Sequence, residues 1–313
     1  MEINARRSDW TVLAAQWERS LKAKNKAEST RTKYLRSLSK FADWASGAGV
    51  DLDPYKVAED DVEAFIADQF DSTTRYGRPP TPESVAIDFR QLKVFFGWLS
   101  RREKLPHPMR DLRAPAVPEK MVPVLTDDDL RRLLKACVGD DFTARRDRAM
   151  IRMLFDCGLR REELAGITLD DVNFDEQYVI VLGKGSRQRM VPYGANTAEA
   201  LDDYMRARLR HKDSRLPALW LASPPNHRGA LGYDGIHQML KRVATRAGLT
   251  KSVYAHRFRH TAAHTQLSAG MSEGDAMRVF GWRSRVMVDR YGASAAHDRA
   301  MAAARRISHA DRI

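Results

Sequence analysis

The segment from Tyr254 to His264, "YAHRFRHTAAH", concentrates side chains that can bind anions or move protons. Its three histidines are four residues apart and would share one helix face, as in a helical metal site. Zinc enzymes built on paired helical histidines also need a neighbouring carboxylate and a third ligand. Arg257 and Arg259 occupy these turns instead, and their charges would repel a dication. The segment therefore predicts no metal site.

His256 and Arg259 are more informative as a pair, because one helical turn separates them. A guanidinium group binds phosphate oxygens through two parallel hydrogen bonds, and an imidazole beside it can transfer a proton. The pair points to phosphate chemistry, although an ordinary surface turn is also compatible with it.

Three further segments contain candidate groups. "GLRREEL" contains Arg160 and Glu163, and "VLGKGSRQRMVPY" places Lys184 at the tip of a hairpin. "FGWRSRVMVDRYGAS" contains Trp282 and Tyr291. Each has a structural alternative: a helix cap, a turn lysine, a core aromatic or a partly buried tyrosine.

Together these segments resemble the tyrosine recombinase (phage integrase) family over essentially the whole chain. The family pattern has G-L-R-x-x-E-L, a G-K-G hairpin, H-x-L-R-H, a His or Trp after a glycine, and a nucleophilic Tyr. The matching residues, spaced 24, 72, 3, 23 and 9 apart, are Arg160, Lys184, His256, Arg259, Trp282 and Tyr291. Phe258 replaces the usual leucine. Trp282 replaces the more common histidine, and the family tolerates a tryptophan at this position.

The resemblance implies a site-specific recombinase that cuts and rejoins duplex DNA. Tyr291 would attack phosphorus, leaving a 3′-phosphotyrosyl link and a free 5′ hydroxyl that can reverse the reaction without ATP. Arg160 and Arg259 would stabilise the charge that develops on the phosphate oxygens, so neither a metal nor another cofactor is expected.

The remaining site residues receive roles by the same resemblance. Lys184 would protonate the leaving 5′ oxygen, and His256 would accept the Tyr291 proton or bond the phosphate. The indole of Trp282 can only donate its N–H. His260 and Glu163 would support the site, or both are purely structural.

The expected fold is mainly α with a small antiparallel β-hairpin or sheet, in a two-domain recombinase clamp. Helical apolar spacing fills residues 1–104, a core-binding (SAM-like) domain. Five prolines mark a linker at 105–125, and a catalytic domain follows at 126–313. Its expected helices cover 142–157, 160–167, 196–210, 233–247, 256–269, 273–281, 284–291 and 294–307, and a short strand is expected at 218–223.

A net charge of +12 and a pI near 9.8 favour a polyanionic partner. Most of the positive excess lies in 126–313. We expect the partner to be duplex DNA carrying a specific recombination site. Candidate DNA contacts, for which a solvated surface is the alternative, are Arg31, Lys33, Arg36, Lys40, Arg90, Lys93, Arg283 and Arg285.

The C-terminal helix expected at 294–307 carries a small apolar stripe, Ala296, Ala300, Ala304 and Ile307. In the family the corresponding helix docks on a neighbouring subunit, which implies a tetramer on two DNA sites and a monomer in free solution. Docking on its own domain is the alternative.

Cys137 and Cys157 lie in separate apolar stretches, so they predict buried thiols and no disulfide framework. No segment predicts a signal peptide or a membrane span, and we expect a cytoplasmic protein.

Three hypotheses about function remain open. A DNA-binding protein that has lost catalysis is disfavoured by the intact residue set, and a type IB topoisomerase by the compact spacing. Among recombinases, an integrase of a phage or mobile element, with an accessory directionality factor, competes with a Xer-like resolvase of chromosome or plasmid dimers. Trp282 favours the former.

Overall fold

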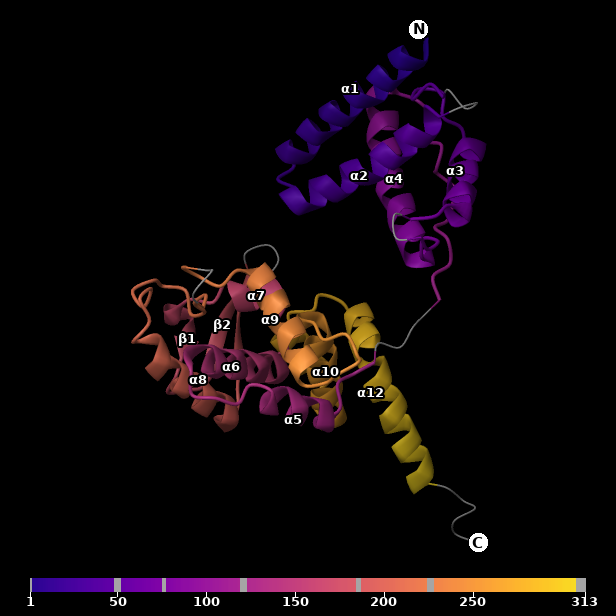
Figure 1. The fold of residues 1–313 in the computed structure, drawn as a ribbon. Coiled ribbons are helices and arrows are strands. Elements are labelled where there is room, and N and C mark those ends of the chain that lie inside the picture. The colour runs from indigo at the N-terminus through magenta and orange to yellow at the C-terminus, as the bar shows by residue number, and fades with distance from the viewer. Residues whose placement is uncertain are drawn as a thin grey trace. The chain divides into compact units, whose positions relative to one another are not determined.

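The computed structural model describes residues 2–47, 52–74, 77–118, 123–183, 187–223 and 228–307. The chain divides into two compact units, Met1–Lys120 and Met121–Ile313. The described part is mainly helical, with one small antiparallel sheet, which confirms the expected fold class (Figure 1). Within it, no helix has the length and apolar character needed to cross a lipid bilayer.

The first unit is built from four helices, α1 (Glu2–Ala23), α2 (Glu28–Ala45), α3 (Glu59–Asp71) and α4 (Pro82–Glu103). Its core is rich in aromatic side chains, and the ring of Phe41 lies 5.0–5.6 Å from four others. Thr81 caps α4 by accepting a hydrogen bond from the Ser84 backbone, and Pro82 follows at the first helical position, where its missing N–H is not needed.

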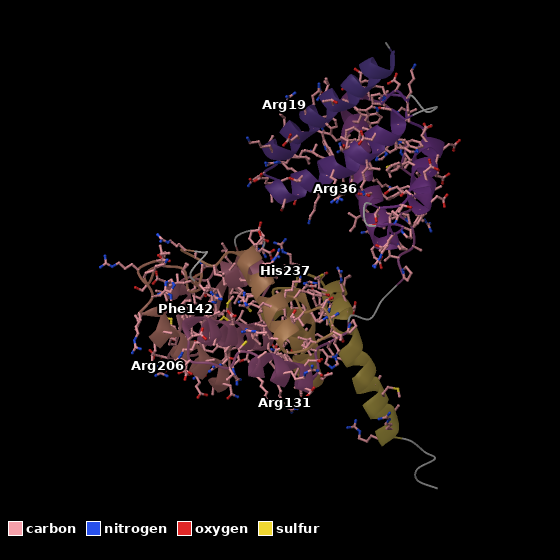
Figure 2. The ribbon with its side chains drawn as sticks, viewed as in Figure 1. Arg19, Arg36, Arg131, Phe142, Arg206 and His237 are labelled. Atoms are coloured by element: carbon pink, nitrogen blue, oxygen red, sulfur yellow. The ribbon has the colours of Figure 1, made fainter. Side chains whose placement is uncertain are left out.

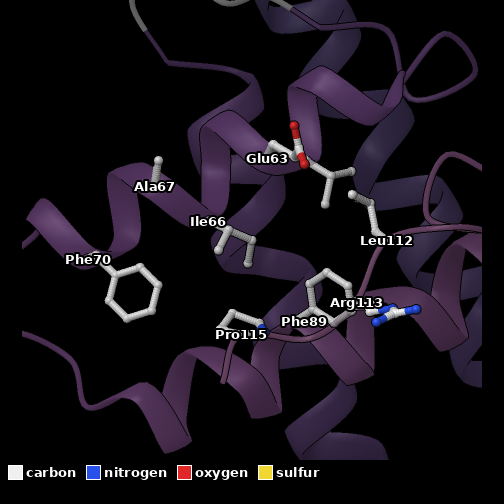
Figure 3. A pocket seen from close by; sticks show the side chains of 9 residues that line it. Glu63, Ile66, Ala67, Phe70, Phe89, Leu112, Arg113 and Pro115 are labelled. Carbon is white, nitrogen blue, oxygen red and sulfur yellow. The ribbon is translucent and has the colours of Figure 1, made fainter. Parts of the chain in front are cut away.

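The first part of the linker expected at 105–125 packs on the first unit. Met109 is fully buried in the core of the first unit, and the Lys93 ammonium donates to the carbonyls of Arg110 and Leu112. Leu112, Arg113 and Pro115 line an apolar pocket of about 330 Å³ against α3 and Phe89 (Figure 3). Composition alone did not show that apolar residues among the prolines pack back on α3 and α4.

The second unit begins with α5 (Asp127–Lys135) and α6 (Phe142–Cys157), followed by the short helix α7 (Arg161–Ala165) and the turn η1 (Leu169–Asp171). The sheet follows, with strands β1 (Val172–Asn173), β2 (Tyr178–Gly183) and β3 (Arg187–Pro192) in that order. β2 and β3 pair antiparallel, with Gly183 opposite Arg187, so the predicted hairpin is present. The remaining helices are α8 (Ala195–Arg208), α9 (Tyr233–Arg246), α10 (Ala255–Ser268), α11 (Glu273–Phe280) and α12 (Arg285–Arg306).

Two expected elements of the second unit are wrong. The strand expected at 218–223 is absent from the described residues, where Ala218 and Leu221 form only isolated bridges. The helices expected at 284–291 and 294–307 are one continuous helix, α12. Gly292 lies in the gap left between the two expected helices, and a Cβ there would come within 2.9 Å of Leu267 on α10. The glycine permits close packing, which outweighs its helix cost of about 1 kcal/mol.

The C-terminal half of α12 projects from the rest of the second unit (Figure 1). Ala296, Ala300, Ala304 and Ile307 are all exposed, so this stripe is not docked on its own domain.

Phe41→Ala is expected to destabilise the first unit by about 3–5 kcal/mol, because the buried ring would leave a cavity among four aromatic neighbours. Urea unfolding followed by circular dichroism measures the change. Val12→Ala on α1 is the control, since that side chain is 49% exposed. Equal stability of the two variants would contradict the packing described here.

Candidate active site

Arg259 lies at the centre of the site and has no exposed surface. It sits in the first turns of α10. One terminal nitrogen donates to the Gly158 carbonyl at 2.9 Å, and the other donates to the Phe280 carbonyl. Gly158 ends α6 and Phe280 ends α11, so the guanidinium joins the ends of two helices to α10.

Three aromatic rings surround the Arg259 guanidinium. Its central carbon lies 5.3 Å from the ring of Phe280, 5.8 Å from Trp282 and 5.7 Å from Tyr291. Burial, followed by the charge of Arg160, lowers the pKa of Arg259 to about 10. The group therefore remains a cation at neutral pH, placed against ring faces that attract positive charge.

Tyr291 comes from α12 and is 5% exposed. Its hydroxyl lies 3.1 Å from Nε2 of His256, within hydrogen-bonding distance. Its ring stacks on His260 at 4.3 Å and on Trp282 at 5.1 Å. Tyr291 is thus one of the three rings that enclose the buried Arg259, and a phosphate can reach this guanidinium only if the surrounding groups move.

Both histidines of α10 near Tyr291 favour the neutral form. Burial, and then the charge of Arg259, lowers the pKa of His256. Burial, and then His256, lowers the pKa of His260 to about 4. A neutral His256 next to a phenol has a free lone pair, so it can accept the phenolic proton.

Arg160 precedes α7 and is held by Glu163 one turn later. Its Nη1 donates to Glu163 Oε1 at 2.6 Å, and its backbone N–H donates to Oε2 at 2.9 Å. The Arg160 side chain is 34% exposed, whereas that of Glu163 is 3% exposed. Burial raises the pKa of Glu163, but hydrogen bonds and charge from Arg189, and then Arg160, lower it to about 2.

A groove of about 790 Å³ runs beside Arg160 and Trp282, between the β2–β3 hairpin and the α11–α12 turn. Five arginines line it, so it suits an anionic strand. They are Arg160, Arg187, Arg189, Arg278 and Arg283. Trp282 Nε1 is buried and has no hydrogen-bond partner among the described residues.

The predicted site residues are largely brought together. Arg259, His256, His260, Trp282 and Tyr291 form one cluster, and the groove links Arg160 to Trp282. The expected hairpin lysine, Lys184, lies outside the described residues, which end at Gly183 and resume at Arg187. No group of three metal-ligating side chains occurs within the described ranges.

The candidate DNA contacts fall into two groups. Lys33, Arg36 and Arg90 are exposed in the first unit, and Arg283 and Arg285 are exposed in the second (Figure 2 labels Arg36). The others have partners within the first unit: Arg31 donates to the Lys26 carbonyl, Lys40 pairs with Asp88 at 2.5 Å, and Lys93 bonds backbone carbonyls.

Arg189 was missed by the sequence analysis. It bonds Glu163 and the Val279 carbonyl from β3. The alternating arginines in "SRQRMVP" were its only signal, and that pattern equally suits an exposed strand face.

Comparison with known proteins identifies the family. The model of the phage integrase family matches residues 123–298, and the model of the phage integrase N-terminal SAM-like domain matches 13–104. Tyrosine recombinase XerC of Xanthomonas axonopodis pv. citri (strain 306) is 31% identical over 77% of this chain and 78% of its own length. Tyrosine recombinase XerD of Bifidobacterium longum (strain NCC 2705) is 28% identical over 82% of this chain and 84% of its own.

Solved structures share the fold. XerH recombinase bound to a palindromic difH substrate, a post-cleavage complex, aligns with a TM-score of 0.72 and 16% identity over 93% of this chain and 84% of that one. The Tn1549 transposon integrase in complex with transposon right end DNA aligns with a TM-score of 0.72 and 18% identity, over 94% of this chain and 99% of that one. The chain belongs to the phage integrase family, and it is a tyrosine-type site-specific recombinase that breaks and rejoins DNA.

Gly158→Ala is expected to destabilise the second unit by about 1–3 kcal/mol. Gly158 has φ +56°, and a Cβ there would come within 2.5 Å of Phe280. Chemical denaturation measures the loss. Gly232→Ala is the matched control, because Gly232 has φ −74° and nothing within 4 Å of its added Cβ. The expectation fails if the control loses as much stability as Gly158→Ala.

Stability is expected to fall between pH 6.5 and 4 because of His260. Its folded pKa of about 4 lies below the ordinary value near 6.5, so the unfolded chain binds the proton first and stability is lost on acidification. The loss is on the order of 2–3 kcal/mol. His260→Phe keeps a ring against Tyr291 and should show a shallower dependence in urea unfolding at pH 7 and 5. Identical pH dependence in both proteins would refute this assignment.

Proposed function

We propose that Tyr291 is the nucleophile that cuts one DNA strand at a specific site. Its hydroxyl oxygen forms a bond to phosphorus, the bond from phosphorus to the 5′ oxygen breaks, and a 3′-phosphotyrosyl link remains. The observation that carries this proposal is the 3.1 Å contact between the Tyr291 hydroxyl and Nε2 of a neutral His256. His256 takes the phenolic proton.

Arg160 and Arg259 stabilise the negative charge that develops on the non-bridging oxygens. Fixed cations act most strongly where charge grows in the transition state, because they are already oriented. The unpartnered N–H of Trp282 supplies a further donor. Lys184 on the hairpin protonates the departing 5′ oxygen.

The chemistry requires a rearrangement before the first step. In the free chain the Tyr291 ring covers Arg259, which has no exposed surface. The scissile phosphate therefore takes the place of this ring beside Arg259, while the hydroxyl turns towards phosphorus. Binding of DNA to the groove provides the free energy for this change.

The recombinase acts as a tetramer on two DNA sites, and the end of α12 docks on a neighbouring subunit. Support comes from the exposed stripe of Ala296, Ala300, Ala304 and Ile307, in which Ile307, directly after α12, is 64% exposed. Met301 on α12 is 44% exposed as well. The exposed basic residues of both units hold the duplex. An accessory factor sets the direction of recombination.

The first candidate biological role is integration of a mobile element. The second is resolution of chromosome or plasmid dimers, as by a Xer-like resolvase. The relatives named XerC and XerD at 28–31% identity favour it. Mapping the covalent cleavage position on element and chromosomal DNA separates the two roles.

Tyr291→Phe is expected to abolish covalent trapping on a nicked suicide duplex carrying the recombination site, because a phenyl ring has no attacking oxygen. Denaturing gel electrophoresis measures the protein–DNA adduct. DNA binding by the variant, measured by mobility shift, should persist and serves as the control. Adduct formation by Tyr291→Phe, or no adduct with the unmodified chain, would contradict the proposed function.

A further inference from the structure

Arg189 joins three elements of the second unit through its side chain. Nη1 and Nη2 each donate to a different oxygen of Glu163 at 2.9 Å, and Nε donates to the Val279 carbonyl at 2.8 Å. β3 carries Arg189, α7 carries Glu163, and Val279 lies in the last turn of α11. All three guanidinium nitrogens therefore donate hydrogen bonds within the protein.

Glu163 passes this constraint to Arg160. The same carboxylate accepts both the Arg160 side chain at 2.6 Å and the Arg160 backbone N–H at 2.9 Å. Because this carboxylate is only 3% exposed, its orientation depends on its two arginine partners. Loss of Arg189 would free Glu163 to rotate and would move the Arg160 guanidinium with it.

The end of α11 closes tightly on Arg189. Gly281 has φ +63°, and a Cβ there would lie 3.2 Å from Cδ of Arg189. The next residue is Trp282, whose ring stacks on Tyr291. Arg189 thus fixes the turn that carries Trp282 as well as the place of Arg160.

We propose that Arg189 is a positioning residue for strand cleavage, which holds Arg160 through Glu163 and Trp282 through the end of α11. This inference rests on the proposed function. Arg189 acts on the reaction through these groups, since its own nitrogens already bond Glu163 and Val279. In metal sites, partners that orient a ligand are typically worth about 10–100-fold in affinity or activity, and we expect an effect of that order here.

The charge on the scissile phosphate separates positioning from a merely structural role. In a methylphosphonate linkage, a neutral methyl group replaces one non-bridging oxygen. The same bond to the Tyr291 oxygen forms and the same bond to the 5′ oxygen breaks, but less negative charge develops for Arg160 to stabilise. Damage that acts through Arg160 should therefore be milder on this substrate, whereas general damage to the fold should affect both substrates equally.

The experiment measures the rate of adduct formation on suicide duplexes with a phosphodiester or a methylphosphonate at the cleavage position. Arg189→Gln is expected to lose roughly 10–100-fold on the phosphodiester and a distinctly smaller factor on the methylphosphonate. Arg160→Ala provides the benchmark for this substrate dependence. The double variant should lose less than the product of the two single losses, because part of the effect of Arg189→Gln already acts through Arg160.

Arg206→Gln is the matched control, since it also removes one positive charge. Arg206 pairs with Asp202 and Asp203 at the surface of α8, and its variant should cleave both substrates like the unmodified chain (Figure 2). If Arg189→Gln fails to fold, Arg189→Lys replaces it in the comparison of the two substrates. Lysine keeps the charge but cannot donate two parallel hydrogen bonds to both oxygens of Glu163.

Equal losses on the two substrates, or no loss on the phosphodiester, would overturn the positioning role. An unmodified chain that forms no adduct overturns the proposed function instead, because that measurement involves no change at Arg189.

Discussion

The burial of one positive charge organises this site. Arg259 has no exposed surface, and a buried cation is tolerated only where acceptors and polarisable groups surround it. The carbonyls of Gly158 and Phe280 supply the acceptors, and three aromatic rings cover the remaining faces. The ends of α6 and α11 must therefore meet over α10. This requirement explains why Gly158 ends α6 in a left-handed conformation that leaves room for Phe280.

The two arginines of the site are held by different means, and this difference fits two tasks. Backbone carbonyls fix Arg259, and the Tyr291 ring is one of the three rings that enclose it. Under the proposed mechanism its charge becomes available only when Tyr291 moves. Arg160 remains partly exposed at the groove, where Glu163 orients it. Under the proposed mechanism, DNA would therefore contact Arg160 first, and the complete set of donors would form only around a bound phosphate.

The residues of the expected chemistry could be predicted from the sequence, but the residues that hold them in place could be predicted only in part. Arg160, His256, Arg259, Trp282 and Tyr291 were identified because motif and spacing restrict them, and their roles remain predictions. The contacts of Arg189 could not be predicted, because its partners Glu163 and Val279 lie 26 and 90 residues away in the sequence. The alternation of side chains along β3 does not show which face of the strand is buried. The two helices expected at 284–291 and 294–307 are one helix, because helix propensity is local whereas the close packing of Gly292 on Leu267 is not. The packing of Met109 and Leu112 on the first unit was also missed, because the proline-rich composition around them is a local signal and their contacts are not local.

A crystal structure of the chain on its recombination site, with vanadate in place of the scissile phosphorus, would show whether Tyr291 and both arginines act on one phosphate. We expect vanadium bonded to the Tyr291 hydroxyl oxygen, and Arg160 and Arg259 each within hydrogen-bonding distance of its non-bridging oxygens. The Tyr291 ring should then have left the face of Arg259. A complex in which Arg259 stays enclosed by the three rings, while other groups bind those oxygens, would contradict this expectation.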